Sequence, residues 1–495
     1  MIKKTLPSLI LCLIFFLLTA CSPGKESLNE STSDSESTET PIEPYADEMT
    51  FGFWMGVPDG VYRLKTDGSI DFGNSQGYYE REYTDSEMDS FYTDIVSAGF
   101  NVAFPECYNT SKSYNLKILR ASKKAGIKQF IQDGNTTTYL VGNASNYEAY
   151  KSGTLSEEQA VETVKGYLSD YFAYDSFYAI LLIDEPGPEK LDRVGWAKQI
   201  LSKAAPEQLF YCTMPSVYAI GQGQEYEESL ETYDNFLKKY LDLTGYNKFF
   251  CFDFYPLTEI NGISSVDSLW LRNIYSVKKA ANRFDEKNGT YTPIWSFMQA
   301  VGHNSYRELK CKADATYQAY TNMAFGSNGM FWFTYWAPNP GAENGYKDAM
   351  TDINGQKTDV YNYIKETNEE IADVSDVFGK YRWKSIMTSI IRDPKGTLKL
   401  LKDQVENKSK DLTSFSSTKN AILGIFADSL GKDAYLAVNF VEPSSSQTDN
   451  TITLQIKNHE KAEVYINGQK QIADIIDNKL ELLLTAGQGA FIIPL

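Results

Sequence analysis

Apolar and polar positions follow two different periods between Phe51 and Trp336. Short apolar runs of strand length recur there, and the segments between them carry apolar residues every third or fourth position, which is typical of helices buried on one face. Most of the short runs are apolar throughout, as in parallel strands covered on both sides. The eight predicted strands are Phe51–Val57, Phe100–Cys107, Lys128–Gly134, Ala179–Pro186, Leu209–Pro215, Phe249–Pro256, Pro293–Ala300 and Gly329–Trp336.

The segments between these strands carry helix start signals. Thr84 and Glu87 have the spacing of a capping box, and Ser156 and Gln159 form a second one. Gly99 follows the first of these helices directly and indicates where it ends.

Eight strands that alternate with helices predict a (β/α)8 TIM barrel over residues 49–378. The predicted helix-to-strand links are short, whereas the strand-to-helix links are long and polar, which places the active site at the carboxyl ends of the strands. A doubly wound sheet is the competing fold, but it needs a glycine-rich first turn, and Pro58-Asp59-Gly60 is not one.

Residues 379–495 show a different pattern of short β-type segments separated by turn signals such as Asn467-Gly468. We expect a small all-β sandwich domain there. Its predicted strands are Ala421–Ala427, Ala434–Asn439, Thr451–Ile456, Ala462–Ile466, Leu480–Leu484 and Ala490–Leu495.

Residues 1–21 have the pattern of a secretory signal peptide, with Lys3 and Lys4 before a short apolar run. Leu18-Thr19-Ala20-Cys21 resembles the lipobox of bacterial lipoproteins, which implies cleavage and lipidation at Cys21. That resemblance implies an extracytoplasmic protein, anchored by lipid to the bacterial cell membrane or cell surface. Residues 22–48 are rich in Ser, Thr and Glu and predict a disordered linker.

The net charge of −18 and the pI of about 4.8 argue against nucleic acid as a partner. Two histidines in the whole chain exclude a histidine-rich metal centre, and we expect neither a metal nor an organic cofactor. The four cysteines outside the predicted signal fit no zinc spacing and are expected to be buried thiols, with a single Cys212–Cys251 disulfide as the alternative.

Carboxylates, amides and aromatic rings gather where the predicted barrel strands end. Such a mixture suits sugars, because hydroxyl groups need hydrogen-bond acceptors and amides, while the C–H faces of sugar rings stack on aromatic side chains. The candidate site residues are Trp54, Glu106, Asp133, Asp184, Glu185, Asp253, Tyr255, Gln299 and Trp336.

Asp184-Glu185-Pro186, at the end of the fourth strand, resembles the Asn-Glu-Pro motif of retaining clan-A glycoside hydrolases, which are (β/α)8 barrels. The resemblance implies that Glu185 is the general acid/base. Asp184 beside it disfavours ionisation and would raise the pKa, as a general acid requires. The stretch Leu480–Pro494 also resembles the small β-domain that follows such barrels in many surface glycosidases.

The sequence departs from this clan at the end of the seventh strand, where Gln299 replaces the nucleophilic glutamate. Three explanations remain open. The strand count is off by one; another carboxylate, with Asp253 the best placed and Glu106 or Asp133 next, takes the second catalytic role; or the protein binds glycan without cutting it. A substrate N-acetyl group acting as nucleophile, oriented by Asp253 or Asp184, is a further option.

The sequence therefore predicts a lipid-anchored glycoside hydrolase that acts on an extracellular poly- or oligosaccharide, with Glu185 and Asp253 as catalytic residues. The other seven candidates are expected to bind substrate. The alternative is a non-catalytic glycan-binding lipoprotein on a degenerate hydrolase barrel. A solute-binding lipoprotein of a transporter would need two lobes, which eight evenly spaced strands do not predict.

Overall fold

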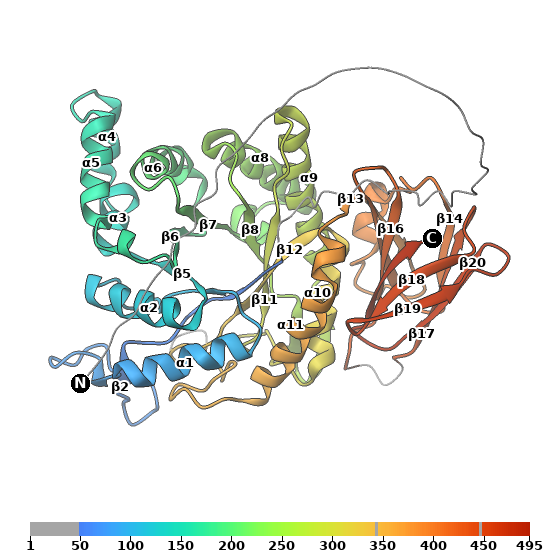
Figure 1. The fold of residues 1–495 in the computed structure, drawn as a ribbon, viewed down its shortest axis with the longest axis horizontal. Helices are drawn as coiled ribbons and strands as arrows, with labels where there is room; N and C mark the ends of the chain where they lie inside the picture. The colour runs from blue at the N-terminus through green and yellow to red at the C-terminus, as the bar shows by residue number, and fades with distance from the viewer. Residues whose placement is uncertain (1–48, 342–344, 445–447) are drawn as a thin grey trace, which may run out of the picture. The chain divides into compact units, whose positions relative to one another are not determined.

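A computed structural model describes residues 49–341, 345–444 and 448–495. Its larger part is a parallel sheet of eight strands in the order β1-β12-β11-β8-β7-β6-β5-β4 (Figure 1). Each predicted barrel strand has an observed counterpart. The strands are β1 (Thr50–Phe53), β4 (Val102–Ala103), β5 (Lys128–Ile131), β6 (Phe177–Asp184), β7 (Leu209–Met214), β8 (Phe250–Asp253), β11 (Ile294–Gln299) and β12 (Ser327–Phe333).

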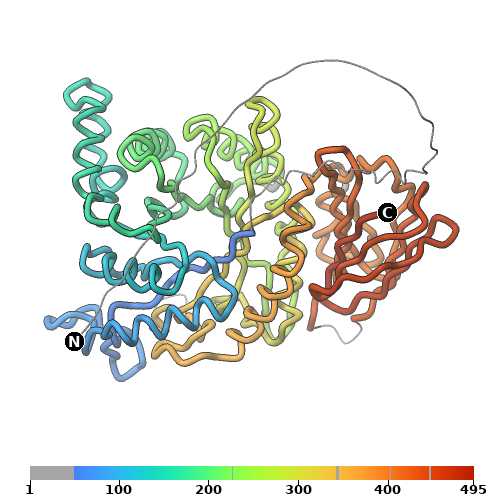
Figure 2. Tube along the Cα trace, in the orientation of Figure 1, coloured from blue at the N-terminus to red at the C-terminus, as the bar shows by residue number. Residues whose placement is uncertain are grey.

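Backbone hydrogen bonds join the two end strands of this sheet, β1 and β4. The Asn101 N–H donates to the Phe51 carbonyl at 3.2 Å, and the Gly56 N–H donates to the Pro105 carbonyl at 3.1 Å. Figure 2 shows the first strand, in blue, running into the middle of the later barrel strands. The sheet thus curves back on itself, which confirms the predicted (β/α)8 barrel.

Helices follow the barrel strands along the chain and bury their apolar faces against the outside of the sheet. Both predicted capping boxes are present, at Thr84 with Glu87 and at Ser156 with Gln159. The helices are α1 (Asp85–Ser97), α2 (Lys112–Ala125), α3 (Gly134–Thr137), α4 (Ala144–Lys151), α5 (Glu157–Leu168), α6 (Leu191–Ala204), α7 (Val217–Ile220), α8 (Tyr226–Thr244), α9 (Trp270–Asn288), α10 (Lys312–Ala324) and α11 (Asp359–Phe378).

Aromatic rings fill the inside of the barrel. The Phe249 and Trp295 rings stack with centroids 3.8 Å apart, and Phe104 stacks on Phe130 at 4.2 Å. Gly52 makes room for this filling, because a Cβ there would lie 2.2 Å from the Phe331 ring. The interior is therefore packed, and a ligand site has room only at the end of the barrel.

Two short hairpins extend the strand-to-helix segments, and the sequence patterns did not predict them. β2 (Gly60–Tyr62) pairs with β3 (Tyr79–Glu82), and β9 (Leu257–Ile260) pairs with β10 (Ile263–Val266). These strands are only three or four residues long, and most residues of β3, β9 and β10 are partly or fully exposed, so they show no apolar run.

The chain after α11 forms two antiparallel sheets that share one apolar core, which confirms the predicted sandwich. All six predicted strands are present, and β13, β14 and β19 are additional. One sheet contains β13 (Arg382–Ser389), β15 (Ala421–Ala427), β16 (Asp433–Asn439), β21 (Gly489–Pro494), β18 (Lys461–Ile466) and β19 (Gln469–Asp474). The other contains β14 (Leu412–Ser417), β17 (Asn450–Ile456) and β20 (Lys479–Leu484).

The predicted signal peptide, its lipidation site Cys21 and the predicted linker lie outside the described residues. Within the described ranges, no helix is both long enough and apolar enough to cross a membrane.

Candidate functional site

A cavity of about 220 Å³ opens at the carboxyl ends of the barrel strands, beyond the aromatic filling. Its walls carry three carboxyl groups and several aromatic rings, and the residues that line it include no lysine or arginine. The lining residues are Trp54, Asp184, Glu185, Thr213, Asp253, Tyr255, Phe297, His303, Phe333 and Tyr346. Five of the nine predicted site residues are among them.

A bulge in β6 turns Asp184 toward this cavity. The register of β6 against β7 shifts between Leu181 and Ile183, so β6 carries one extra residue. Leu181 faces the inside of the barrel and Ile183 packs against the outer core. Asp184 therefore faces inward again, opposite Thr213, which hydrogen-bonds its carboxyl group.

The Asp184 carboxyl is open to the cavity on one side and enclosed by protein on the others. This loss of hydration, together with the neighbouring charge of Glu185, raises the pKa of Asp184 to about 7, while the Thr213 hydrogen bond opposes the shift. Asp184 consequently exchanges its proton near neutral pH.

Glu185 directly follows β6 in a strained backbone conformation. Its φ of 42° lies in the left-handed region, which a residue with a long side chain rarely adopts. The Glu185 N–H donates to the Thr213 carbonyl at 3.2 Å, and the side chain is exposed in the cavity. Backbone strain of this kind concentrates at functional sites.

Asp253 ends β8, which is separated from β6 by β7 alone, and shares a hydrogen bond with Glu185. Burial raises the pKa of Asp253 well above its usual range, the charges of Glu185 and Asp184 raise it further, and a hydrogen bond from Tyr255 opposes the rise. A hydrogen bond between two carboxyl groups requires one proton. Because the pKa of Asp253 is raised, Asp253 holds this proton and donates it to Glu185.

Aromatic side chains form the other walls. The Trp54 ring lies 6.0 Å from Phe297, and the Tyr255 ring lies 5.1 Å from Phe333, measured between centroids. His303 lies 5.0 Å from Tyr346 by the same measure. Burial lowers the pKa of His303, so its imidazole is neutral at neutral pH.

Glu106 and Asp133 lie elsewhere, which corrects their prediction as substrate-binding residues. Glu106 is fully buried and accepts hydrogen bonds from the hydroxyls of Tyr62, at 2.6 Å, and Tyr79. Asp133 caps α3 through the Thr136 N–H at 2.8 Å and accepts a hydrogen bond from Tyr171 at 2.8 Å. Both carboxylates therefore accept hydrogen bonds from groups of the protein rather than from a substrate.

Gln299 and Trp336 are also fully buried, and neither lines the cavity. The Gln299 amide bonds the N–H and carbonyl of Leu257, at 3.1 and 3.0 Å, and the carbonyl of Arg307 at 2.5 Å. The Trp336 indole N–H donates to the Ile353 carbonyl at 3.2 Å. Both side chains hold loops in place, so their prediction as sugar ligands is wrong.

The sequence patterns left five lining residues off the predicted site. His303 lies four residues beyond Gln299, in the loop that follows β11. Phe297 and Phe333 lie on the inward faces of β11 and β12, so strict alternation within those strands would have found them. Thr213 carries the same signal at the end of β7, whereas Tyr346 lies in a long loop and has no periodic signal.

The described residues contain no group of three or more His, Cys, Asp or Glu side chains that could hold a metal ion. The thiols of Cys107, Cys212, Cys251 and Cys311 are free. Cys212 packs in the outer core and Cys251 in the barrel interior, so the alternative Cys212–Cys251 disulfide does not form.

No protein-family model matches the sequence, and no curated protein matches it significantly. A glycoside hydrolase family 5 structure from Bacteroides vulgatus is 11% identical over 90% of this chain and 95% of that one, with a TM-score of 0.45. A structure described as a glycoside hydrolase is 10% identical over 89% of this chain and 98% of that one, also with a TM-score of 0.45.

An FMN-binding β-glucuronidase from Facaelibacterium prausnitzii is 9% identical, with a TM-score of 0.35. The match covers 83% of this chain and 52% of that one, so this chain spans about half of its length. At these identities and TM-scores the similarities carry no argument about activity. In the cavity itself, three carboxyl groups meet between aromatic walls at the end of a (β/α)8 barrel.

Proposed function

We propose that this protein is a glycoside hydrolase that acts on an extracellular glycan and is held at the bacterial cell surface by a lipid on Cys21. The carboxyl cluster of Asp184, Glu185 and Asp253 carries the proposal, because no lysine or arginine lines the cavity to neutralise it. Carboxyl groups kept partly protonated near neutral pH are suited to proton transfer to a leaving oxygen. The aromatic walls suit the C–H faces of a sugar.

Glu185 is the proposed general acid/base. It lies open in the cavity, and the proton that Asp253 donates toward it is available for the glycosidic oxygen. Water that enters after the bond breaks returns a proton to Glu185, so the site is restored after each turnover.

The spacing of the carboxyl groups favours nucleophilic attack by the substrate itself. Two-carboxyl glycosidases separate the groups by about 5–5.5 Å when they retain configuration and about 6.5–9.5 Å when they invert it. The hydrogen bond between Glu185 and Asp253 makes this pair closer than either arrangement. A 2-acetamido group on the substrate would supply the missing nucleophile, with Asp253 and Tyr255 orienting it.

The test is release of sugar from a broad panel of oligosaccharides and aryl glycosides, using protein that begins at Ser22. We expect turnover of at least one glycan, with 2-acetamido sugars preferred over their 2-hydroxy counterparts. Glu185→Gln should abolish release, whereas Glu162→Gln, which removes one exposed carboxylate on α5, should leave it unchanged. Activity that survives Glu185→Gln would contradict the assignment of Glu185.

A different outcome would favour the glycan-binding alternative. If the wild-type protein binds an oligosaccharide in this cavity but never cleaves any member of the panel, the barrel is a binding module and the hydrolase proposal fails.

A further inference from the structure

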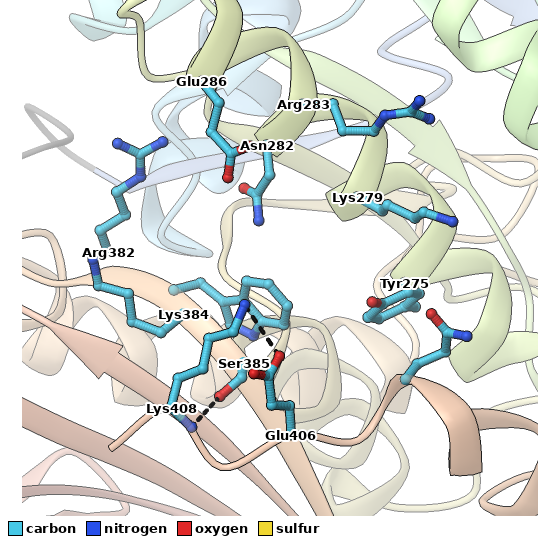
Figure 3. Close-up of a pocket in the computed structure, with 12 residues that line it drawn as sticks. Tyr275, Lys279, Asn282, Arg283, Glu286, Arg382, Lys384, Ser385, Glu406 and Lys408 are labelled. Carbon is cyan, nitrogen blue, oxygen red and sulfur yellow. Dashed lines mark hydrogen bonds and ion pairs between the residues drawn. The ribbon is translucent and has the colours of Figure 1, made fainter. Parts of the chain in front are cut away.

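A second, larger cavity of about 390 Å³ lies between α9 and the chain at the start of the β domain. Figure 3 shows side chains from α9 on one side of this cavity and side chains from β13 and the 404–408 segment on the other. None of its lining residues belongs to the carboxyl-lined cavity.

Positive charge dominates this cavity although the whole chain carries a net charge of −18. Five cationic side chains line it, against the carboxylates of Glu286 and Glu406. The five are Lys279, Arg283, Arg382, Lys384 and Lys408. A concentration of positive charge on an acidic protein is what a site for an anion requires.

Three of these cations have no ion pair with any carboxylate in the described ranges. Lys279 pairs with Asp234 at 3.1 Å and Lys408 with Glu406 at 3.1 Å. Arg283, Arg382 and Lys384 have no such partner among the described residues. Their positive charge is therefore available to a ligand.

The neighbouring positive charges destabilise the charged form of Lys384. Partial burial lowers the pKa of Lys384, and the positive charge of Arg382 beside it lowers the pKa further. An anion bound in the cavity would offset this repulsion.

The neutral part of the lining suits a carbohydrate. The rings of Tyr275 and Trp383 offer apolar faces, and the amides of Asn282 and Gln404 can both donate and accept hydrogen bonds. A nucleic acid or an anionic membrane is disfavoured, because each presents an extended negative surface to a protein with a net charge of −18.

We propose that this cavity binds an acidic sugar unit of a glycan chain, one that carries a carboxylate or a sulfate. Arg283, Arg382 and Lys384 supply the positive charge that attracts the acidic unit, while Tyr275 and Asn282 contact the ring and its hydroxyls. The proposal concerns binding alone, so it stands or falls independently of whether the carboxyl-lined cavity cleaves glycans.

Titration calorimetry of the chain beginning at Ser22 tests the proposal with two acidic probes, a galacturonate tetrasaccharide and a chondroitin sulfate tetrasaccharide. The methyl-esterified galacturonate tetrasaccharide is the neutral counterpart. We expect one acidic probe to bind with a stoichiometry of one and with an affinity that falls as salt rises. The neutral counterpart should bind at least about tenfold more weakly.

The variant Arg283→Gln/Lys384→Gln should weaken acidic-probe binding by at least about tenfold. The control Lys65→Gln/Lys165→Gln removes the same charge from exposed positions outside both cavities and should bind as the wild type does. A melting temperature close to that of the wild type verifies that each variant is folded.

Several results would overturn the proposal. These are failure of both acidic probes to bind, equal losses in the two double variants, and equally tight binding of inorganic sulfate, which indicates a simple anion site. Binding to phosphatidylglycerol vesicles that depends on Arg283 and Lys384, without binding of either tetrasaccharide, would assign the surface to lipid instead.

Discussion

At the scale of single residues, the position of a side chain relative to its strand decides its role. Trp54 directly follows β1 and lines the carboxyl-lined cavity, whereas Trp336 lies three residues beyond β12 and is completely buried. Sequence alone made them equivalent, because both are tryptophans near the end of a barrel strand. Their different environments predict different consequences of substitution.

Trp336→Ala should lower the free energy of unfolding by about 3–5 kcal/mol, because it empties a buried site and removes the bond to Ile353. Trp54→Ala should act mainly on substrate affinity and raise KM. Chemical denaturation and steady-state kinetics of both variants separate these effects. A Trp336→Ala protein of unchanged stability but impaired sugar binding would show that Trp336 contacts the sugar.

Glu106 predicts a pH-dependent contribution to stability. Burial raises the pKa of Glu106 to about 7 in the folded protein, above its usual value of 4.5. Between these pH values the folded state holds a proton that the unfolded state releases, so the free energy of unfolding falls as pH rises, by up to about 1.4 kcal/mol per pH unit from this group.

Glu106→Gln should flatten that slope, because glutamine has no proton to lose, while its amide can accept a hydrogen bond from one of the hydroxyls of Tyr62 and Tyr79 and donate one to the other. Urea denaturation of wild type and variant at several pH values between 4.5 and 8 measures the difference. Parallel stability curves over this range would show that Glu106 does not titrate there.

At the scale of elements, the ends of the barrel strands orient the side chains that line the cavity, and buried side chains near these ends hold the adjoining loops in place. The β6 bulge directs Asp184 inward, and Gln299 at the end of β11 bonds the backbone of Leu257, the first residue of β9, and of Arg307 in the loop after β11. Gln299 stands where retaining clan-A glycoside hydrolases carry their nucleophilic glutamate, but among the described residues its side chain bonds only the protein backbone.

Gln299→Ala should therefore cost about 2–4 kcal/mol of stability, because it leaves buried backbone groups of Leu257 and Arg307 without partners. Well below the melting temperature, kcat should stay close to the wild-type value. Thermal melts and kinetics at low temperature provide the measurement. A large loss of kcat in a variant of unchanged stability would instead place Gln299 in the chemistry.

The sequence predicted elements better than it predicted side-chain environments. Continuous apolar runs identified all eight barrel strands, and short β-type segments separated by turn signals identified six strands of the sandwich. The polar edge strand β19 and the two hairpins carry no such pattern. Among the predicted site residues, Glu106 and Asp133 were candidates because carboxylates at strand ends often bind sugar hydroxyls. Only the fold shows that they bond Tyr62 and Thr136 instead.

At the scale of the whole molecule, the barrel and the β domain share buried contacts. Arg307 forms a bidentate ion pair with Asp314 and a third bond, at 2.7 Å, to Glu442 in the β domain. Aromatic rings continue the contact, with Phe378 of α11 lying 5.3 Å from Phe491 of β21 between centroids. One hydrophobic cluster includes residues from both parts.

We expect the described part of the chain to unfold in one cooperative calorimetric transition, because one large hydrophobic cluster includes residues from both parts. Arg307→Ala leaves Asp314 buried without its cation, which should lower the free energy of unfolding by about 3–5 kcal/mol. The temperature of the single transition should fall accordingly. Two separate transitions in the wild-type protein, one for each part, would show that the parts are independent.

The central claim is that Glu185 protonates the leaving group of a glycoside, and leaving-group dependence tests it most directly. The measurement compares kcat/KM of wild type and Glu185→Gln on two glycosides of the same sugar, one with a dinitrophenyl leaving group and one with a sugar leaving group. Glu185→Gln should lose at least about a hundredfold on the sugar leaving group and little on dinitrophenolate, which departs without a proton. Equal losses on both substrates, or no loss on either, would contradict the account.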